Sequence, residues 1–211
     1  MPSNHFESDE LHTLVQHIKI WGRELGFQQV GITDTDLQQH EERLQQWLRA
    51  RYHGSMQYMQ AHGSKRSRPA ELIEGTLRVI SVRLDYLPAD TDALQVLDNP
   101  QQAFISRYAL GRDYHKLMRK RLATLAQKIK NFTTANHNYR AFVDSAPVLE
   151  RALAEKAGLG WIGKNTLLLN RKAGSWFFLG EIYTDLPLPV DAPHASKHCG
   201  SCHACIDICP T

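Results

Sequence analysis

Cys199-Gly-Ser-Cys202-His-Ala-Cys205-Ile-Asp-Ile-Cys209-Pro210 holds all four cysteines of this 211-residue chain. The spacing, C-x2-C-x2-C-x3-C followed by proline, is the bacterial spacing of [4Fe–4S] cluster ligands. Cluster irons take soft thiolate ligands, and two-residue gaps let one tight loop aim three sulfur atoms at one small cluster. The sequence therefore predicts iron–sulfur ligation in this segment.

Two other uses of these cysteines are open. A zinc site usually has two C-x2-C pairs that lie far apart in the sequence, whereas only two or three residues separate successive cysteines here. A disulfide framework needs an oxidising compartment, whereas the N-terminal residues carry no recognisable signal peptide. We favour iron–sulfur ligation over both.

The fourth cysteine indicates more than one cluster. In two-cluster ferredoxins, the last cysteine of such a run binds the other cluster. Cys199, Cys202 and Cys205 would then bind a first [4Fe–4S] cluster, and Cys209 would bind a second. Neither cluster finds its full set of ligands among these residues. We therefore expect this chain to be the N-terminal part of a longer protein.

Length and composition allow one sizeable domain and the start of another. Apolar residues make up 42% of the chain, and the formal net charge is +3 at pH 7. A charge this small permits a nucleic-acid partner without indicating one, because an electrostatic binding face needs clustered basic residues. No apolar run is long enough to span a bilayer, and no twin-arginine address is present. We expect a cytoplasmic monomer that does not bind membranes.

The hydrophobic pattern upstream of the cysteines predicts a mixed α and β domain. Apolar residues recur at helical spacing in four segments. β-branched and aromatic residues concentrate in others. The expected helices cover 8–26, about 37–51, 115–129 and a segment through 150–155. The expected strands cover 27–33, 78–86 and 139–143, and a strand pair, 167–169 with 176–183, is joined by 170–174. Residues 88–102 read as a surface loop.

Several polar segments stand out in this domain. Asp144 ends the strand 139–143, where open sheets place ligand chemistry, although a helix N-cap is the simpler role for an acid just before a helix. The basic loop 65–69 is either solvated or an anion clamp. Residues 105–115 gather charged and aromatic side chains around one glycine. The glycines of 158–163 do not match a dinucleotide-binding motif, so no nicotinamide site is expected.

Together these segments resemble the epoxyqueuosine reductase family, and the resemblance extends over nearly the whole chain. Its most specific elements are the pairing of V-D-S-A-P-V-L-E-R with G-L-G-W-I-G-K-N and the cysteine run. The matching stretches are W-G-R-E-L-G-F-Q-Q-V-G-I-T-D-T-D-L (21–37), H-G-S-M-Q-Y-M (53–59), R-P-A-E-L-I-E-G-T-L-R-V-I-S-V-R (68–83), S-R-Y-A-L-G-R-D-Y-H (106–115), F-V-D-S-A-P-V-L-E-R (142–151), A-G-L-G-W-I-G-K-N-T-L-L (157–168) and G-S-W-F-F-L-G-E (174–181).

The resemblance implies a fold and a domain organisation. Residues 1–186 would form an α/β (α+β) cobalamin-binding catalytic domain, a nitroreductase-like sheet with flanking helices. Residues 187–211 would begin a ferredoxin-like [4Fe–4S] module. The second cluster motif and the C-terminal helical-repeat domain of the family lie outside these residues.

The resemblance also implies an activity. The family reduces epoxyqueuosine to queuosine at the wobble position of tRNA with G-U-N anticodons, the last step of queuosine biosynthesis. The reaction uses cobalamin reduced by two [4Fe–4S] clusters, which are incomplete in this chain, and an external electron donor such as flavodoxin or ferredoxin. Both cofactor types fit low-potential electron delivery.

Residue roles follow from the matching motifs. Asp144 would be the proton donor and would lie against cobalamin. Leu168 and Leu179 would line the cobalamin. Arg66 and Arg107 are candidates for its periphery or for tRNA phosphate. Residues bordering the substrate pocket would be Tyr108, Asp113, Tyr114 and His115. A polar network that only supports the sheet would explain these softer assignments equally well.

Three competing interpretations are open. A respiratory reductive dehalogenase would share cobalamin and two clusters but should carry a twin-arginine signal. A non-enzymatic electron-transfer protein would leave the large mixed domain unexplained. A truncated, inactive relative would keep the cobalamin pocket without complete clusters.

Overall fold

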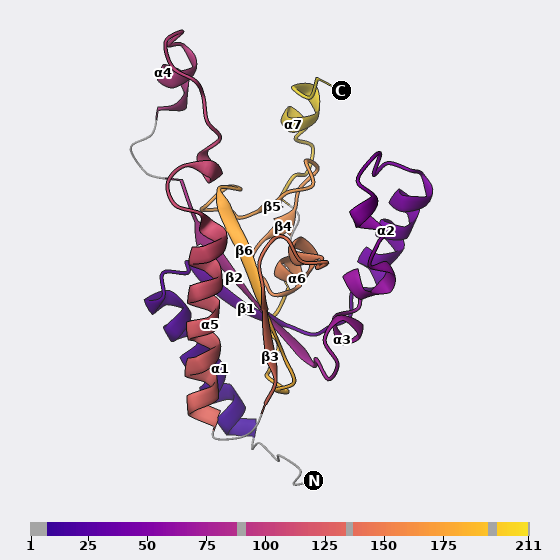
Figure 1. Ribbon diagram of the computed structural model, residues 1–211, viewed down its shortest axis with the longest axis vertical. Coiled ribbons are helices and arrows are strands. Elements are labelled where there is room, and N and C mark those ends of the chain that lie inside the picture. The colour runs from indigo at the N-terminus through magenta and orange to yellow at the C-terminus, as the bar shows by residue number, and fades with distance from the viewer. Residues whose placement is uncertain (1–7, 88–91, 134–136, 194–197, 211) are drawn as a thin grey trace.

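The computed structural model describes residues 8–87, 92–133, 137–193 and 198–210. Its centre is a four-stranded sheet in the order β1-β2-β6-β3, with β1 at Gln29–Thr33, β2 at Arg78–Asp85, β3 at Tyr139–Phe142 and β6 at Phe177–Thr184 (Figure 1). Every pairing in it is antiparallel. The strand latest in sequence, β6, therefore lies between β2 and β3 as an inner strand.

One face of the sheet packs against two long helices, α1 (Ser8–Glu24) and α5 (Tyr114–Thr133), which lie together in Figure 1. Both helices bury apolar residues at the three- and four-residue spacing of an amphipathic helix. Ile18 of α1, Leu122 of α5 and Ile80 of β2 are fully buried in one core. Burying each such aliphatic side chain stabilises the fold by about 1.5–3 kcal/mol.

The opposite face carries α6 (Glu150–Lys156) and a small hairpin of β4 (Trp161–Ile162) with β5 (Leu168–Leu169). Gly31 of β1 allows this packing, because a Cβ there would lie 2.0 Å from the carbonyl oxygen of Ala157. The end of α6 therefore rests directly on the backbone of β1.

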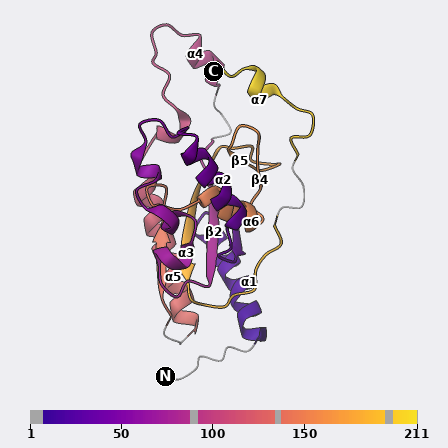
Figure 2. The ribbon, with the colours of Figure 1, turned by 90° about the vertical axis from the view of Figure 1, so that its right-hand side faces the viewer.

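The remaining elements are peripheral. The segment with α2 (Gln38–Arg49), η1 (Gln57–Met59), η2 (Gly63–Arg66) and α3 (Pro69–Leu72) projects from the sheet and faces the viewer in Figure 2. α4 (Ala93–Leu97), η3 (Arg107–Ala109) and α7 (Ala204–Asp207) lie beyond one end of the sheet (Figure 1). None of the helices in the described ranges combines the length and apolar character needed to cross a lipid bilayer.

The structure confirms most of the predicted elements and corrects two. The expected pair 167–169 and 176–183 is wrong, because β5 pairs with β4 while β6 pairs with β2 and β3. The connecting segment 170–174 closes on itself through an isolated antiparallel bridge between Asn170 and Gly174. The expected loop 88–102 contains α4, whose N-cap Asp92 accepts hydrogen bonds from two backbone N–H groups. Residues 88–91 of that loop lie outside the described residues.

Candidate active site

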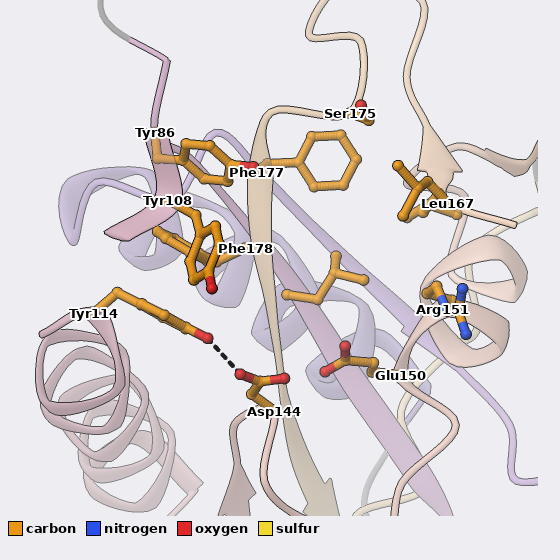
Figure 3. A pocket seen from close by; sticks show the side chains of 12 residues that line it. Tyr86, Tyr108, Tyr114, Asp144, Glu150, Arg151, Leu167, Ser175, Phe177 and Phe178 are labelled. Carbon is orange, nitrogen blue, oxygen red and sulfur yellow. Dashed lines mark hydrogen bonds between the residues drawn. The ribbon is translucent and has the colours of Figure 1, made fainter. Parts of the chain in front are cut away.

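An open pocket with a cavity volume of about 210 Å³ lies at the end of the sheet where β6 begins (Figure 3). Aromatic and aliphatic side chains form most of its wall, and one basic and two acidic side chains join them at one side. The lining residues are Tyr86, Tyr108, Tyr114, Asp144, Glu150, Arg151, Leu167, Leu168, Ser175, Phe177, Phe178 and Leu179. Concave sites with few polar groups in an apolar wall are typical of ligand and cofactor binding.

Asp144 is held at the edge of this pocket by two neighbours from the start of α5. The Tyr114 hydroxyl donates a hydrogen bond to Asp144 Oδ2 (Figure 3). His115 Nε2 lies 3.1 Å from the same oxygen, and His115 Nδ1 lies 3.0 Å from Asp113 Oδ1. The hydrogen bonds from His115 lower the pKa of Asp113. This arrangement fixes the Asp144 carboxyl while leaving its side chain 49% exposed toward the pocket.

Tyr114 is a stable donor in this contact. Burial, followed by its hydrogen bond to Asp144, raises the pKa of Tyr114 well above the usual value of 10.0. Its ring stacks on Phe178 with a centroid distance of 3.8 Å and on His115 at 4.0 Å. The stack orients the hydroxyl, and the raised pKa keeps the hydroxyl protonated at neutral pH.

The backbone of Asp144 is unusual. Its φ of +49° lies in the left-handed region, which only a few per cent of non-glycine residues adopt. Aspartate and asparagine are enriched among those residues. The sharp turn points the carboxyl out of the β3 strand line and toward Tyr114.

Two glutamates lie near Asp144, one in α6 and one in β6 on the sheet face that α6 covers. Burial, followed by the Asp144 carboxylate, raises the pKa of Glu150 to about 7. Glu181 in β6 is fully buried. Burial first, and then the nearby carboxylates, raise the pKa of Glu181 well above its usual value of 4.5. Perturbed carboxyls in a cleft are a physical indicator of a functional site.

The predicted site residues divide into two groups. Asp144, Leu168, Leu179, Tyr108 and Tyr114 line the pocket, and His115 with Asp113 adjoins it. Arg66 and Arg107 do not line it. Arg66 is buried and donates to the carbonyl oxygens of Tyr58 at 2.9 Å and Met59 at 3.2 Å. Its contact with cobalamin or tRNA stays a prediction, as does that of Arg107.

The cysteine segment is tied to the loop between β4 and β5. Lys164 Nζ donates to the carbonyl oxygens of Gly200 at 2.9 Å and Cys202 at 3.0 Å. The Lys164 backbone N–H, and then the Trp161 indole, bond the Cys199 sulfur and lower the pKa of that thiol. A lowered pKa favours the thiolate, which is the form that binds iron.

The donor set of this segment fits an iron–sulfur cluster by chemistry, because four thiols lie within eleven residues and no disulfide joins them. In the described part of the chain, however, no three histidine, cysteine or acidic side chains converge as metal ligands do. The predicted assignment of Cys199, Cys202 and Cys205 to one cluster and Cys209 to another stays a prediction. The apolar wall of the pocket, in contrast, suits the flat face of a macrocycle such as cobalamin.

The sequence-based analysis gave no site role to eight residues: Tyr86, Glu150, Arg151, Leu167, Ser175, Phe177, Phe178 and Glu181. Tyr86, Phe177 and Phe178 read as ordinary strand residues. Glu181 carried a usable signal, because it is the only charged residue in the β6 sequence Phe-Phe-Leu-Gly-Glu-Ile-Tyr-Thr. An inner strand buries both faces, so a lone acid there needs a reason.

Comparison with known proteins shows that the chain is similar to epoxyqueuosine reductases. The family described as "Epoxyqueuosine reductase QueG, DUF1730" matches residues 66–145, which include Tyr114, His115 and Asp144. The epoxyqueuosine reductase of Pseudomonas aeruginosa is 69% identical over 198 residues, which are 94% of this chain and 55% of that protein. The chain thus spans about half the length of the curated relatives it matches.

Solved structures agree with the sequence comparison. A crystal structure of epoxyqueuosine reductase with an epoxyqueuosine-modified tRNA-Tyr stem loop has a TM-score of 0.82 and 25% identity, over 95% of this chain and 52% of that one. A catabolic reductive dehalogenase has a TM-score of 0.53 and 14% identity, over 93% of this chain and 22% of that one. The second likeness is one of fold alone.

Proposed function

Nearly the whole of this chain is homologous to about half of an epoxyqueuosine reductase, and on that premise we propose that it carries the catalytic site for reducing epoxyqueuosine in tRNA to queuosine. The observation that carries the proposal is the Asp144 carboxyl, fixed by Tyr114 and His115 at the edge of a pocket lined mainly by aromatic and aliphatic side chains. An acid held in that way can protonate an oxygen of a bound ligand.

Reduction of an epoxide requires a proton donor close to the oxygen. Converting the epoxide to an alkene breaks two carbon–oxygen bonds and consumes two electrons and two protons, and the oxygen leaves as water. Negative charge develops on the oxygen as the ring opens, so proton donation from Asp144 lowers the barrier. Tyr114 and His115 hold the carboxyl in position.

Cobalamin is the cofactor proposed for this pocket. Leu168 and Leu179 would pack against it, and Asp144 would face it across the pocket. When bound and reduced, cobalamin would supply the electrons of the reaction. Its macrocycle needs an apolar wall with few competing polar groups, and the residues around Leu168 match that need.

The domain organisation and the partners are part of the same proposal. Residues 1–186 would form the cobalamin-binding domain with a nitroreductase-like sheet, and residues 187–211 would begin a ferredoxin-like module with two [4Fe–4S] clusters. Cys199, Cys202 and Cys205 would bind the first cluster and Cys209 the second. A flavodoxin or ferredoxin would deliver electrons to a cytoplasmic monomer, and the substrate would be tRNA with a G-U-N anticodon.

The experiment is anaerobic loading with iron, sulfide and cobalamin, followed by incubation with epoxyqueuosine-containing tRNA and a chemical reductant. We expect a base-off cobalamin spectrum and loss of one oxygen atom from the modified base, read by mass spectrometry. Asp144→Asn should keep the spectrum and lower the rate at least about 100-fold, the scale of general acid catalysis. Absence of cobalamin binding would contradict the proposal.

The chain could also bind cobalamin without assembling complete iron–sulfur clusters. Because the chain spans about half of its relatives, it can bind cobalamin and still lack a complete electron path. Cobalamin binding with far fewer than about eight irons per chain, the content of two [4Fe–4S] clusters, would indicate an inactive partial relative.

A further inference from the structure

Asp144 lies at the edge of the sheet beside the strand that carries Glu181. In the antiparallel register Phe142 of β3 lies opposite Glu181 of β6, on the face covered by α6. Two residues later the chain turns at Asp144, whose side chain bonds Tyr114 and His115 of α5.

Glu150 lies beside Asp144 at the first turn of α6. Leu153 and Ala154, three and four positions further along this helix, and Ala157 at its C-cap are all buried. The i, i+3, i+4, i+7 spacing places Glu150 on the same sheet-facing stripe. Its carboxylate accepts a hydrogen bond from the Asp144 backbone N–H, and Figure 3 shows the carboxyl pointing toward Asp144.

Glu181 is the deepest of the three carboxyls. Its side chain is fully buried, and neither Oε1 nor Oε2 has a hydrogen-bond partner among the residues that the structure describes. The hydroxyl of Ser81, its cross-strand neighbour on β2, is also buried and has no partner in the same part of the chain. An ionised carboxylate in such a place costs several kcal/mol, so Glu181 keeps its proton.

No neighbouring cation neutralises this pair within the described residues. Arg151, the closest base, donates to the Thr166 carbonyl oxygen, although it lowers the pKa of Glu150 somewhat. Lys156 on the same helix pairs with Asp34. The other titratable groups facing the pair are the hydroxyls of Tyr114 and Tyr183, whose pKa values are raised by burial first.

We propose that Glu150 is a proton reservoir that recharges Asp144 during the reaction, with Glu181 as a neutral neighbour that keeps its own proton. The inference rests on the proposed function, which needs two protons for each epoxide reduced. Asp144 gives the first proton to the epoxide oxygen and becomes a carboxylate. Glu150 then passes its proton to Asp144, which delivers it to the leaving hydroxyl, and solvent returns a proton to Glu150 after the product leaves.

The reservoir has a physical purpose. Asp144 is half exposed in the ligand-free pocket, so solvent can recharge it there. A bound tRNA base and macrocycle would cover that opening and exclude water from Asp144. Both protons must then already be stored on the protein side when the substrate binds. The burial of Glu150 raises its pKa to about 7, so it holds a proton on a large share of molecules at neutral pH.

The first test is a titration of the carboxyl groups in the purified protein without cofactor or tRNA. Infrared difference spectra should show one protonated carboxyl that ionises near pH 7 and is absent in Glu150→Gln. A second protonated carboxyl should persist to higher pH and be absent in Glu181→Gln, an isosteric change that retains the fold. Glu155→Gln, on the same helix but off the stripe, should keep both signals. Finding both glutamates ionised at about pH 5 would overturn the reservoir.

The second test measures reduction of the tRNA by the loaded enzyme across pH. Glu150→Gln should lower the single-turnover rate roughly 10-fold or more and remove the decline in rate above neutral pH, while Glu150→Asp should restore part of both. Glu155→Gln should match wild type. An unchanged rate and pH profile in Glu150→Gln would overturn the reservoir while leaving the proposed function intact. An inactive wild type with the expected carboxyl titration would instead overturn the proposed function.

Discussion

At the scale of single residues, the site depends on side chains that hold one another in place. Tyr114 contributes a hydroxyl to Asp144 and a ring to the stack with Phe178 and His115. The stack fixes where the hydroxyl points, and the hydroxyl fixes where the carboxyl points. Precise placement of an acid is a large part of its effect on rate, because small displacements from the reactive geometry are costly.

Tyr114→Phe should therefore slow tRNA reduction while leaving the fold intact. The ring stack is retained, but the Asp144 carboxyl loses the donor that orients it, and we expect roughly a 10-fold lower rate. Tyr86→Phe, in the same pocket wall, is the matched control and should be near wild type. Equal rates for wild type and Tyr114→Phe would show that His115 alone positions the acid.

The raised pKa of Glu150 should make the free energy of unfolding depend on pH. Its pKa is raised by burial from 4.5 to about 7, so the folded state binds this proton more tightly than the unfolded state. The resulting stabilisation is complete below about pH 4.5 and is lost as pH rises to about 7, with an upper limit of about 3 kcal/mol. Urea unfolding should show Glu150→Gln with a flatter pH dependence in this window. A wild-type stability that rises across the window would contradict the assignment.

At the scale of secondary-structure elements, the hydrophobic periodicity of the sequence predicted which helices and strands exist but not which strands pair with one another. The apolar spacing predicted α1 and α5, and the β-branched content predicted β1, β2 and β3. The inner position of β6 could not be predicted, because strand order depends on contacts between residues far apart in sequence. Asp144, Tyr114 and His115 were found through a family resemblance. Glu181 was missed because alternation along a strand assigns a lone acid to solvent.

The absence of a Cβ at Gly31 should be necessary for α6 to pack against the sheet. In Gly31→Ala the new Cβ would lie 2.0 Å from the Ala157 carbonyl oxygen and 2.7 Å from Leu159 Cδ1. Backbone cannot yield as a flexible side chain does, so we expect a loss of at least about 3 kcal/mol in unfolding free energy. Ser81→Ala, at the cross-strand position, adds no atoms and removes an unpaired hydroxyl. Its stability should stay near that of wild type, and equal losses for the two variants would contradict this explanation.

The side chain of Lys164 should keep the cysteine segment well ordered, because it bonds two of its carbonyl oxygens. Lys164→Gln removes the ammonium that bonds the carbonyl oxygens of Gly200 and Cys202. It retains the backbone N–H that is the main cause of the lowered pKa of Cys199 and removes only the smaller effect of the positive charge. We expect faster amide hydrogen exchange at residues 199–202 and a small slowing of Cys199 alkylation at neutral pH. Lys172→Gln, in the turn after β5, is the control. Unchanged exchange and alkylation would show that the segment is positioned without Lys164.

At the scale of the whole molecule, the pocket lies where several elements meet rather than within one of them. Its lining comes from the ends of β2 and β6, the start of α5, the start of α6 and the hairpin strand β5 (Figure 1). A ligand bound there contacts all of these elements at once. It should therefore stabilise the entire sheet and its helices rather than one segment.

Cobalamin binding should accordingly raise the melting temperature of the chain. At a free concentration about 100 times the dissociation constant, the gain is about 2.7 kcal/mol. For a domain of about 200 residues this corresponds to a shift of roughly 5–10 °C in thermal unfolding. The shift should be the same in Lys164→Gln, because Lys164 does not line the pocket. A melting temperature that does not change with cobalamin would place the cofactor elsewhere.

The left-handed backbone at Asp144 has a consequence for how this position changes over evolutionary time. Asparagine and glycine accept that conformation as well as aspartate does, so either replacement removes the acid without disturbing the fold. Chaperones and proteases act on misfolded chains, so they would leave such a variant at normal abundance. Natural selection would encounter the loss only through the modified tRNA, and lineages that no longer need that base should accumulate well-folded chains with Asn or Gly at this position.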